Sequence, residues 1–255
     1  MPIILTRMLS QGISIVTTSL LGLGSALAQD AHHDHMTATQ VTESRFMGDA
    51  YLLSVDPVSG DPLSDKPIVS MHEGRELRFA NQKSLDVFKL DPGKYLTKVD
   101  QQMIAYQLPF YPLDICMVSG DKLGGDMGKP VELIYKNRLV RFCCTGCVTD
   151  FNKDPNKFIS KLNEAVIAKQ EPSYPLTSCV VSGQKLGDEM GKPVDLVIGN
   201  RLVRLCCTGC INDFNKNPTK FLKMIDDAAQ KKAADTKQGP SDGAAKSPDH
   251  GGHQH

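Results

Sequence analysis

The strongest constraint on this chain is a stretch of sequence that recurs 63 residues later without a gap. A fixed period of this length is typical of tandem copies of one small folding unit. It predicts that the copies share one fold. The matching pairs are Tyr111 with Tyr174, Cys116 with Cys179, Met127-Gly-Lys-Pro with Met190-Gly-Lys-Pro, and Cys143-Cys-Thr-Gly-Cys with Cys206-Cys-Thr-Gly-Cys.

An earlier segment carries the same framework without any cysteine. Val58-Ser-Gly matches Val118-Ser-Gly, and Arg78-Phe79 matches Arg141-Phe142. The positions of the four cysteines in the next copy are held here by Asp56, Ala80, Asn81 and Ser84. The predicted organisation is a signal peptide (1–28), a histidine-containing flexible segment (29–47), repeat 1 (48–105), repeat 2 (106–170), repeat 3 (171–230) and a disordered histidine-containing tail (231–255).

Each repeat has the same predicted order of elements, which places the chain in the α+β class. In repeat 2 a turn-rich segment at 116–130 leads to a strand at 131–135, a short turn at Lys136-Asn137 and a second strand at 138–142. The cysteine-rich segment then opens a helix, which Asp154-Pro155 breaks and restarts. Because a unit near 60 residues buries little apolar surface, staples or contacts between repeats are expected.

The first 28 residues have the features of a cleaved signal peptide. Arg7 provides a positive start, 8–24 is a largely apolar run, and Ala26-Leu-Ala28 is a cleavage site of the A-x-A type. We therefore expect a periplasmic or secreted protein with no membrane span once the signal is removed. An exported chain can keep disulfides, so its cysteines admit covalent as well as metal-binding roles.

Composition excludes several classes of function. The numbers of basic and acidic residues are equal, at 29 each, so the basic surplus of a nucleic-acid-binding protein is missing. The repeats carry no serine–histidine–acid set, phosphate loop or paired carboxylates, whereas a catalytic site needs unlike groups that converge. We expect a protein that is not an enzyme.

The cysteines of repeats 2 and 3 have the spacing of a metal site. Residues four apart share one face of a helix, so Cys143 and Cys147 can converge toward Cys116 in the preceding turn. Three sulfur donors suit Cu(I), Zn(II) or another thiophilic ion. The neighbouring Cys144 is a fourth ligand, a packing residue or an exchange ligand at the rim. The predicted metal ligands are Cys116, Cys143, Cys144, Cys147, Cys179, Cys206, Cys207 and Cys210.

Two other interpretations of these cysteines remain open. A disulfide from Cys116 to Cys143 or Cys147 would stabilise the unit by about 3–4 kcal/mol through loop closure. Three thiols crowded into five residues are, however, better spaced for a metal than for separate bridges. A redox pair at Cys144 and Cys147 has less support, because that motif follows a hairpin here and not a βαβ unit.

Histidines gather near both ends of the mature chain, in segments too polar to build a core. They are possible auxiliary metal ligands, or else parts of solvated tails. The residues concerned are His32, His33, His35, Met36, His250, His253 and His255.

The pattern Cys-x26-Cys-x3-Cys, with Phe142 before the second cysteine and Phe151 four residues after the third, resembles the YHS and TRASH domains. The latter are named for trafficking, resistance and sensing of heavy metals. The resemblance covers about residues 48–227, with repeat 1 similar to a YHS variant stripped of cysteine. It implies small treble-clef-like folds with ligands at Cys116, Cys143 and Cys147, and at Cys179, Cys206 and Cys210. The longer loop before the second cysteine and the extra Cys144 and Cys207 depart from it.

These observations predict an exported binding protein for a thiophilic heavy-metal ion, copper or zinc, in trafficking, storage or resistance. Its expected partners are the ion and another exported metal-handling or efflux protein. The alternatives are a disulfide- or zinc-stabilised interaction module of an exported complex and, less favoured, a thiol–disulfide redox protein.

Overall fold

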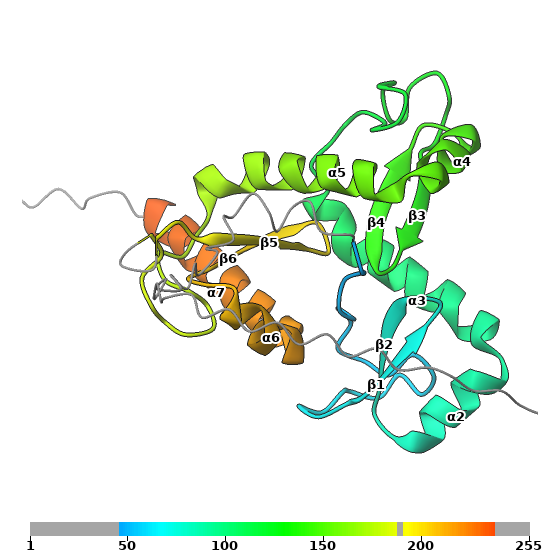
Figure 1. The fold of residues 1–255 in the computed structure, drawn as a ribbon, viewed down its shortest axis with the longest axis horizontal. Coiled ribbons are helices and arrows are strands. Elements are labelled where there is room, and N and C mark those ends of the chain that lie inside the picture. Colours follow the sequence, from blue (N-terminus) through cyan, green and yellow to red (C-terminus); the bar gives the residue numbers. More distant parts are fainter. Residues whose placement is uncertain (1–45, 188–190, 238–255) are drawn as a thin grey trace, which may run out of the picture. The chain divides into compact units, whose positions relative to one another are not determined.

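The computed structural model describes residues 46–187 and 191–237, which all lie within one compact unit of the chain. The predicted α+β class is confirmed: the described residues form six helices, two short 3₁₀ turns and three separate two-stranded antiparallel sheets (Figure 1). None of these helices combines the length and apolarity needed to cross a membrane.

The three sheets are β-hairpins of equal length, in which each five-residue strand pairs fully with its neighbour. Strands predicted at 131–135 and 138–142 are confirmed. Both turn residues of each hairpin have positive φ, as tight two-residue turns require (Lys136 47°, Asn137 69°). The strands are β1 (Ile68–His72), β2 (Arg75–Phe79), β3 (Val131–Tyr135), β4 (Arg138–Phe142), β5 (Val194–Ile198) and β6 (Arg201–Leu205).

Two helices follow each hairpin, and the predicted break between them is confirmed. In repeat 2 the Asp154 side chain accepts a hydrogen bond from the Lys157 N–H and caps a helix that begins at Pro155. Asp91 and Pro92 do the same in repeat 1. The helices are α2 (Gln82–Leu90), α3 (Pro92–Gln107), α4 (Thr145–Lys153), α5 (Pro155–Gln170), α6 (Gly209–Lys216) and α7 (Pro218–Lys237).

α7 continues to Lys237, beyond the boundary predicted at residue 230. Residues 228–237 are mostly alanine, lysine and glutamine, which favour a helix even without burial. Their side chains at 231–236 are exposed, so local helix propensity rather than packing accounts for the extension.

Each hairpin packs its apolar face against its own helices. Phe79 and Phe88 meet in repeat 1 and Phe142 and Phe151 in repeat 2, with ring centroids 5.3 Å apart in both. Phe214 is the corresponding buried ring of repeat 3. All five phenylalanines are buried core residues.

A glutamine at the end of one repeat's long helix holds the hairpin of the next. Gln107, the last residue of α3, donates to the Asn137 carbonyl (2.8 Å) and accepts from the Leu139 N–H (2.8 Å). Gln170, the last residue of α5, makes the same two bonds with Asn200 and Leu202 (2.8 Å each). Buried amides satisfied in this way fix each hairpin on the preceding helix.

The asparagine in each hairpin turn reaches back to the preceding hairpin. The Asn137 side-chain amide donates to the Glu76 carbonyl of β2 (2.8 Å), and that of Asn200 donates to the Leu139 carbonyl of β4 (3.0 Å). Gly74 stands at the corresponding position of repeat 1 and has no side chain to donate. The same polar contact therefore joins repeat 1 to 2 and repeat 2 to 3.

A buried ion pair joins residues from all three repeats. Arg138 binds both oxygens of Asp49 (2.6 and 2.8 Å) and donates to the Val197 carbonyl (2.6 Å). Asp49 Oδ2, which accepts from Arg138 Nε, also accepts from the Gly199 N–H (2.7 Å). A Cβ at position 199 would collide with the end of the buried Leu52 side chain, so a larger residue there would force that side chain to move.

Candidate metal centres

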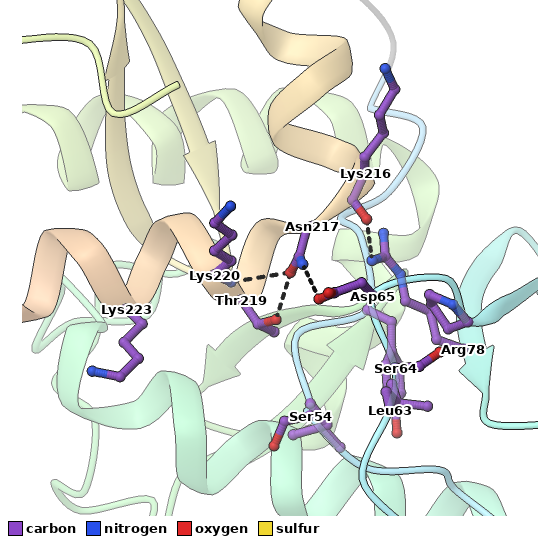
Figure 2. A pocket seen from close by; sticks show the side chains of 13 residues that line it. Ser54, Leu63, Ser64, Asp65, Arg78, Lys216, Asn217, Thr219, Lys220 and Lys223 are labelled. Carbon is purple, nitrogen blue, oxygen red and sulfur yellow. Dashed lines mark hydrogen bonds between the residues drawn. The ribbon is translucent and has the colours of Figure 1, made fainter. Parts of the chain in front are cut away.

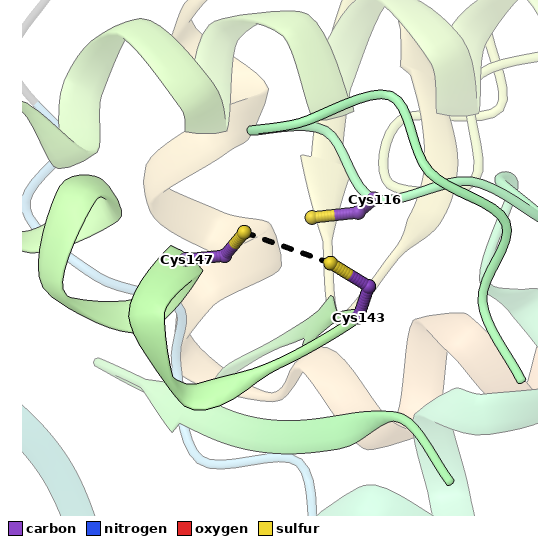
Figure 3. Close-up of side chains that lie close together, drawn as sticks. All are labelled: Cys116, Cys143 and Cys147. Atoms are coloured by element: carbon purple, nitrogen blue, oxygen red, sulfur yellow. Dashed lines mark hydrogen bonds between the residues drawn. The ribbon is translucent and has the colours of Figure 1, made fainter. Parts of the chain in front are cut away.

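Three cysteines of repeat 2 converge from three different elements (Figure 3). Cys116 lies in a tight turn closed by its backbone bonds to Gly120 and Asp121. Cys143 directly follows β4, and Cys147 lies in the first turn of α4. Their sulfur atoms all lie within 4.8 Å of one another, with Cys143 and Cys147 3.6 Å apart.

Repeat 3 forms a second triad in the same way. Cys179 lies in a turn closed by its bonds to Gly183 and Gln184, Cys206 follows β6, and Cys210 lies in α6. The three sulfurs again lie within 4.8 Å of one another. All six triad cysteines are at most 8% exposed. The repeated geometry follows from the repeated hairpin and helix start.

The remaining two cysteines lie beside the triads. Cys144 Sγ is 3.8 Å from Cys147 Sγ, and Cys207 Sγ is 3.9 Å from the sulfurs of Cys206 and Cys210. Both are only half-buried, and all eight cysteines are free thiols in the structure. The separations are far longer than the ~2.05 Å of a disulfide bond.

Backbone N–H groups make the turn cysteine of each triad the most acidic. Burial raises the pKa of Cys116, but hydrogen bonds from Ser119 and the backbone of Cys143 and Val118 outweigh it and lower that pKa to about 7. Burial also raises the pKa of Cys179, but hydrogen bonds from Ser182 and from the backbone of Cys206 and Val181 outweigh it and lower that pKa to about 6. Such positions favour a thiolate, the form that binds metal.

The helix cysteine of each triad is shifted in the other direction. Burial and the adjacent Cys143 thiol raise the pKa of Cys147 to about 12, and burial beside Cys206 raises that of Cys210. Thiols packed this closely cannot all ionise without a cation, because each negative charge disfavours the next. Three thiolates in one triad would therefore need a cation beside them.

Repeat 1 fills the turn position with a carboxylate. Asp56 stands where Cys116 stands in repeat 2, and it accepts from the N–H groups of Val58 (2.7 Å), Ser59 (3.0 Å) and Ala80 (2.7 Å). The aligned N–H groups in repeat 2 are those of Val118, Ser119 and Cys143, the ones that lower the pKa of Cys116. The turn is thus a pocket for an anion, whether thiolate or carboxylate.

Replacing Asp56 with alanine is expected to destabilise repeat 1 by about 1–3 kcal/mol, because three partly buried hydrogen bonds lose their acceptor. The midpoint of urea unfolding, followed by far-UV circular dichroism, measures the loss. The exposed Asp61 in the same loop is the control, since its alanine variant is expected within about 0.5 kcal/mol of the parent. An Asp56 variant as stable as that control contradicts the anion pocket.

Sequence reasoning missed three side chains beside the thiols. The Ser119 and Ser182 hydroxyls lie 3.3 Å from the sulfurs of Cys143 and Cys206. Asp121 Oδ2 lies 3.8 Å from Cys143 Sγ, whereas the aligned residue in repeat 3 is the neutral Gln184. The Val-Ser-Gly motif occurs in all three repeats, and this recurrence could have identified the serines as part of the site.

The remaining predicted ligands, His32, His33, His35, Met36, His250, His253 and His255, lie outside the described residues.

A cavity of about 330 Å³ lies elsewhere, between residues of repeat 1 and the start of α7 (Figure 2). Arg78 crosses to the Asn215 and Lys216 carbonyls (2.6 and 3.0 Å), and Asn217 binds Asp65. Its lining includes no cysteine or histidine. These polar contacts join repeat 3 to repeat 1 and do not form a soft-metal site.

Comparisons with known proteins found no relative: no protein-family model, curated protein or solved structure matches the chain. The resemblance to YHS and TRASH domains therefore rests on the cysteine spacing and the residues around it.

Proposed function

We propose that the chain is an exported, non-catalytic binding protein for a thiophilic metal ion, Cu(I) or Zn(II), and that it handles the ion in trafficking, storage or resistance. The observation that carries this proposal is the pair of buried cysteine triads, each with its sulfurs within 4.8 Å. Three soft donors at this separation are the donor set that such ions prefer.

The anion pocket favours metal over a disulfide. In repeat 1 the Asp56 carboxylate accepts hydrogen bonds from three N–H groups. A disulfide sulfur at the aligned position of repeat 2 or 3 would be neutral and therefore a weak acceptor for the corresponding N–H groups. A metal-bound thiolate keeps its negative charge and makes full use of them. One disulfide would also leave the third thiol of each triad without a partner.

In this proposal the three repeats are treble-clef-like units with different roles. Repeats 2 and 3 each hold one ion. Repeat 1 has the Asp56 carboxylate in place of the turn thiolate, holds no ion, and serves as a scaffold or docking module for another exported metal-handling protein. An interaction module whose cysteines are only structural is the rival, and it predicts that loss of metal unfolds repeats 2 and 3.

Anaerobic purification of the mature protein, followed by elemental analysis and thiol titration, tests the proposal. We expect two thiophilic ions per chain and eight reduced thiols after the metal is removed. No bound metal, together with oxidised cysteines, would refute it.

Metal affinity is expected to rise with pH. Because the pKa of Cys147 and Cys210 is raised, both thiols are protonated near neutrality and an incoming ion must displace their protons. The apparent affinity then increases about tenfold per pH unit for each proton released. Competition titrations from pH 6 to 8 measure this slope, and a flat profile would show that no proton is displaced.

The two centres are expected to differ in metal preference. Asp121 places a carboxylate near the repeat 2 triad, and this negative charge favours a divalent ion over Cu(I). The aligned Gln184 of repeat 3 is neutral and has no such effect. Asp121→Gln is expected to shift the preference of the repeat 2 centre toward Cu(I) by a few-fold, about 0.5–1 kcal/mol for an exposed charge. The reciprocal Gln184→Asp variant should shift repeat 3 the opposite way. Equal preferences in all three proteins would contradict this.

A further inference from the structure

A fourth thiol accompanies each triad at the same place in both repeats. Cys207 Sγ lies 3.9 Å from two triad sulfurs, those of Cys206 and Cys210, and Cys144 Sγ lies 3.8 Å from that of Cys147. Among the described residues, the sulfur atoms that all lie within 4.8 Å of one another are those of the two triads, and the Cys144 and Cys207 sulfurs do not belong to either set. Each fourth thiol therefore touches one side of its triad and lies away from the turn cysteine.

Exposure separates these thiols from the triads. The triad cysteines are buried, whereas Cys144 and Cys207 are half-buried. In repeat 2 the next two residues along the chain, Thr145 and Gly146, are exposed. Cys144 and Cys207 are thus the most solvent-exposed cysteines of the two centres.

The residue two positions after this thiol is a glycine in both repeats. A Cβ built on Gly146 would have the Cys144 sulfur as its nearest neighbour, at 3.7 Å, and Gly209 stands in the same relation to Cys207. Neither glycine has a positive φ, so backbone conformation does not explain its presence. A larger side chain at either position would stand beside the thiol and restrict approach to it.

We propose that Cys144 and Cys207 are exchange ligands, through which each buried triad takes up its ion and passes it to a thiol-bearing acceptor. This inference rests on the proposed function. Soft ions change thiolate partners readily when the new sulfur can bind before the old one leaves. Cys144, touching Cys147 and reaching solvent, is placed for such a step.

The step balances without any oxidant. The bond from the ion to Cys147 Sγ breaks as a bond to Cys144 Sγ forms, and the Cys144 proton passes to Cys147, toward which the Cys144 thiol donates. The acceptor thiolate then replaces Cys144 at the exposed side. The oxidation state of the metal does not change.

The test uses the full mature chain loaded with Cu(I). A Cys144→Ser/Cys207→Ser double variant is compared with the parent in stopped-flow transfer to a chromophoric Cu(I) chelator and in equilibrium competition. We expect transfer to slow by about tenfold or more, equivalent to about 1.4 kcal/mol in the barrier, with affinity changed by less than about threefold. A Gly146→Leu/Gly209→Leu variant, which keeps all eight thiols, is expected to slow transfer in the same direction.

The outcomes separate this inference from the proposed function. Loss of stoichiometric copper in the serine variant would make Cys144 and Cys207 permanent ligands, which overturns the exchange role but leaves metal binding intact. An unchanged transfer rate in a variant that keeps its copper and its circular dichroism spectrum overturns the exchange role as well. Absence of any tightly bound thiophilic ion, Cu(I) or Zn(II), in the parent chain overturns both. Cys147→Ser/Cys210→Ser is the matched control and is expected to lose its copper.

Discussion

Replacing Cys147 with serine is expected to reduce the metal content of the mature protein from two ions per chain to one. Cys147 contributes one of three buried sulfurs and lies 3.6 Å from Cys143. Its hydroxyl replacement is a hard, protonated donor that a soft ion does not bind well. Changes outside the ligand set alone cost 10–100-fold in affinity, so loss of a ligand should cost more than about 100-fold.

Elemental analysis and competition titration of Cys147→Ser measure the loss, and Cys210→Ser tests the other centre independently. The double variant should hold no tightly bound ion. Circular dichroism of each variant distinguishes the two roles of the thiols: a retained fold without metal supports metal handling, and unfolding of repeats 2 and 3 supports a structural role. Two tightly bound ions in Cys147→Ser would exclude the triad as the ligand set.

Replacing Arg138 with methionine is expected to destabilise the fold by about 3–5 kcal/mol, because it leaves a buried Asp49 without its cation. The Arg138 side chain is 0% exposed and that of Asp49 is 4% exposed. The same change also removes the bond to the Val197 carbonyl of β5. One substitution therefore loosens the contact between all three repeats.

Arg141→Met is the matched control for this prediction. Arg141 lies three residues further along β4 and pairs with Glu132 at 3.2 Å, but both side chains are partly exposed. Such pairs contribute about 0–1 kcal/mol. Urea unfolding followed by far-UV circular dichroism compares the two variants. Equal losses would show that the Asp49 pair does not hold the repeats together.

The local fold was predictable because its signals lie close together in the sequence. Five-residue strands around Lys136-Asn137 and a helix restart at Asp154-Pro155 each depend on a few neighbouring residues, and the structure confirms them. The convergence of Cys116, Cys143 and Cys147 was predictable for a related reason. A helix start places residues four apart on one face, and the hairpin returns the chain to the turn.

The contacts between repeats were not predictable from these patterns. Gln107 and Asn137 are ordinary polar residues in the sequence, and only the packing of one helix end on the next hairpin shows that they are buried and paired. Asp49 binds a residue 89 positions away. The role of Asp56 was equally unpredictable. The missing cysteine indicates only that metal binding is lost in repeat 1, and it does not show that the Asp56 carboxylate keeps the same N–H partners.

X-ray absorption at the metal edge tests the central claim most directly. On protein purified anaerobically, the account predicts a first shell of about three sulfur atoms at ~2.3 Å from the ion, supplied by Cys116, Cys143 and Cys147 and by their counterparts Cys179, Cys206 and Cys210. In Cys147→Ser the shell should stay at about three sulfur atoms per ion while the metal content halves, because the remaining ion is held by the intact repeat 3 triad. A first shell of nitrogen and oxygen alone would place the ion elsewhere and contradict the account.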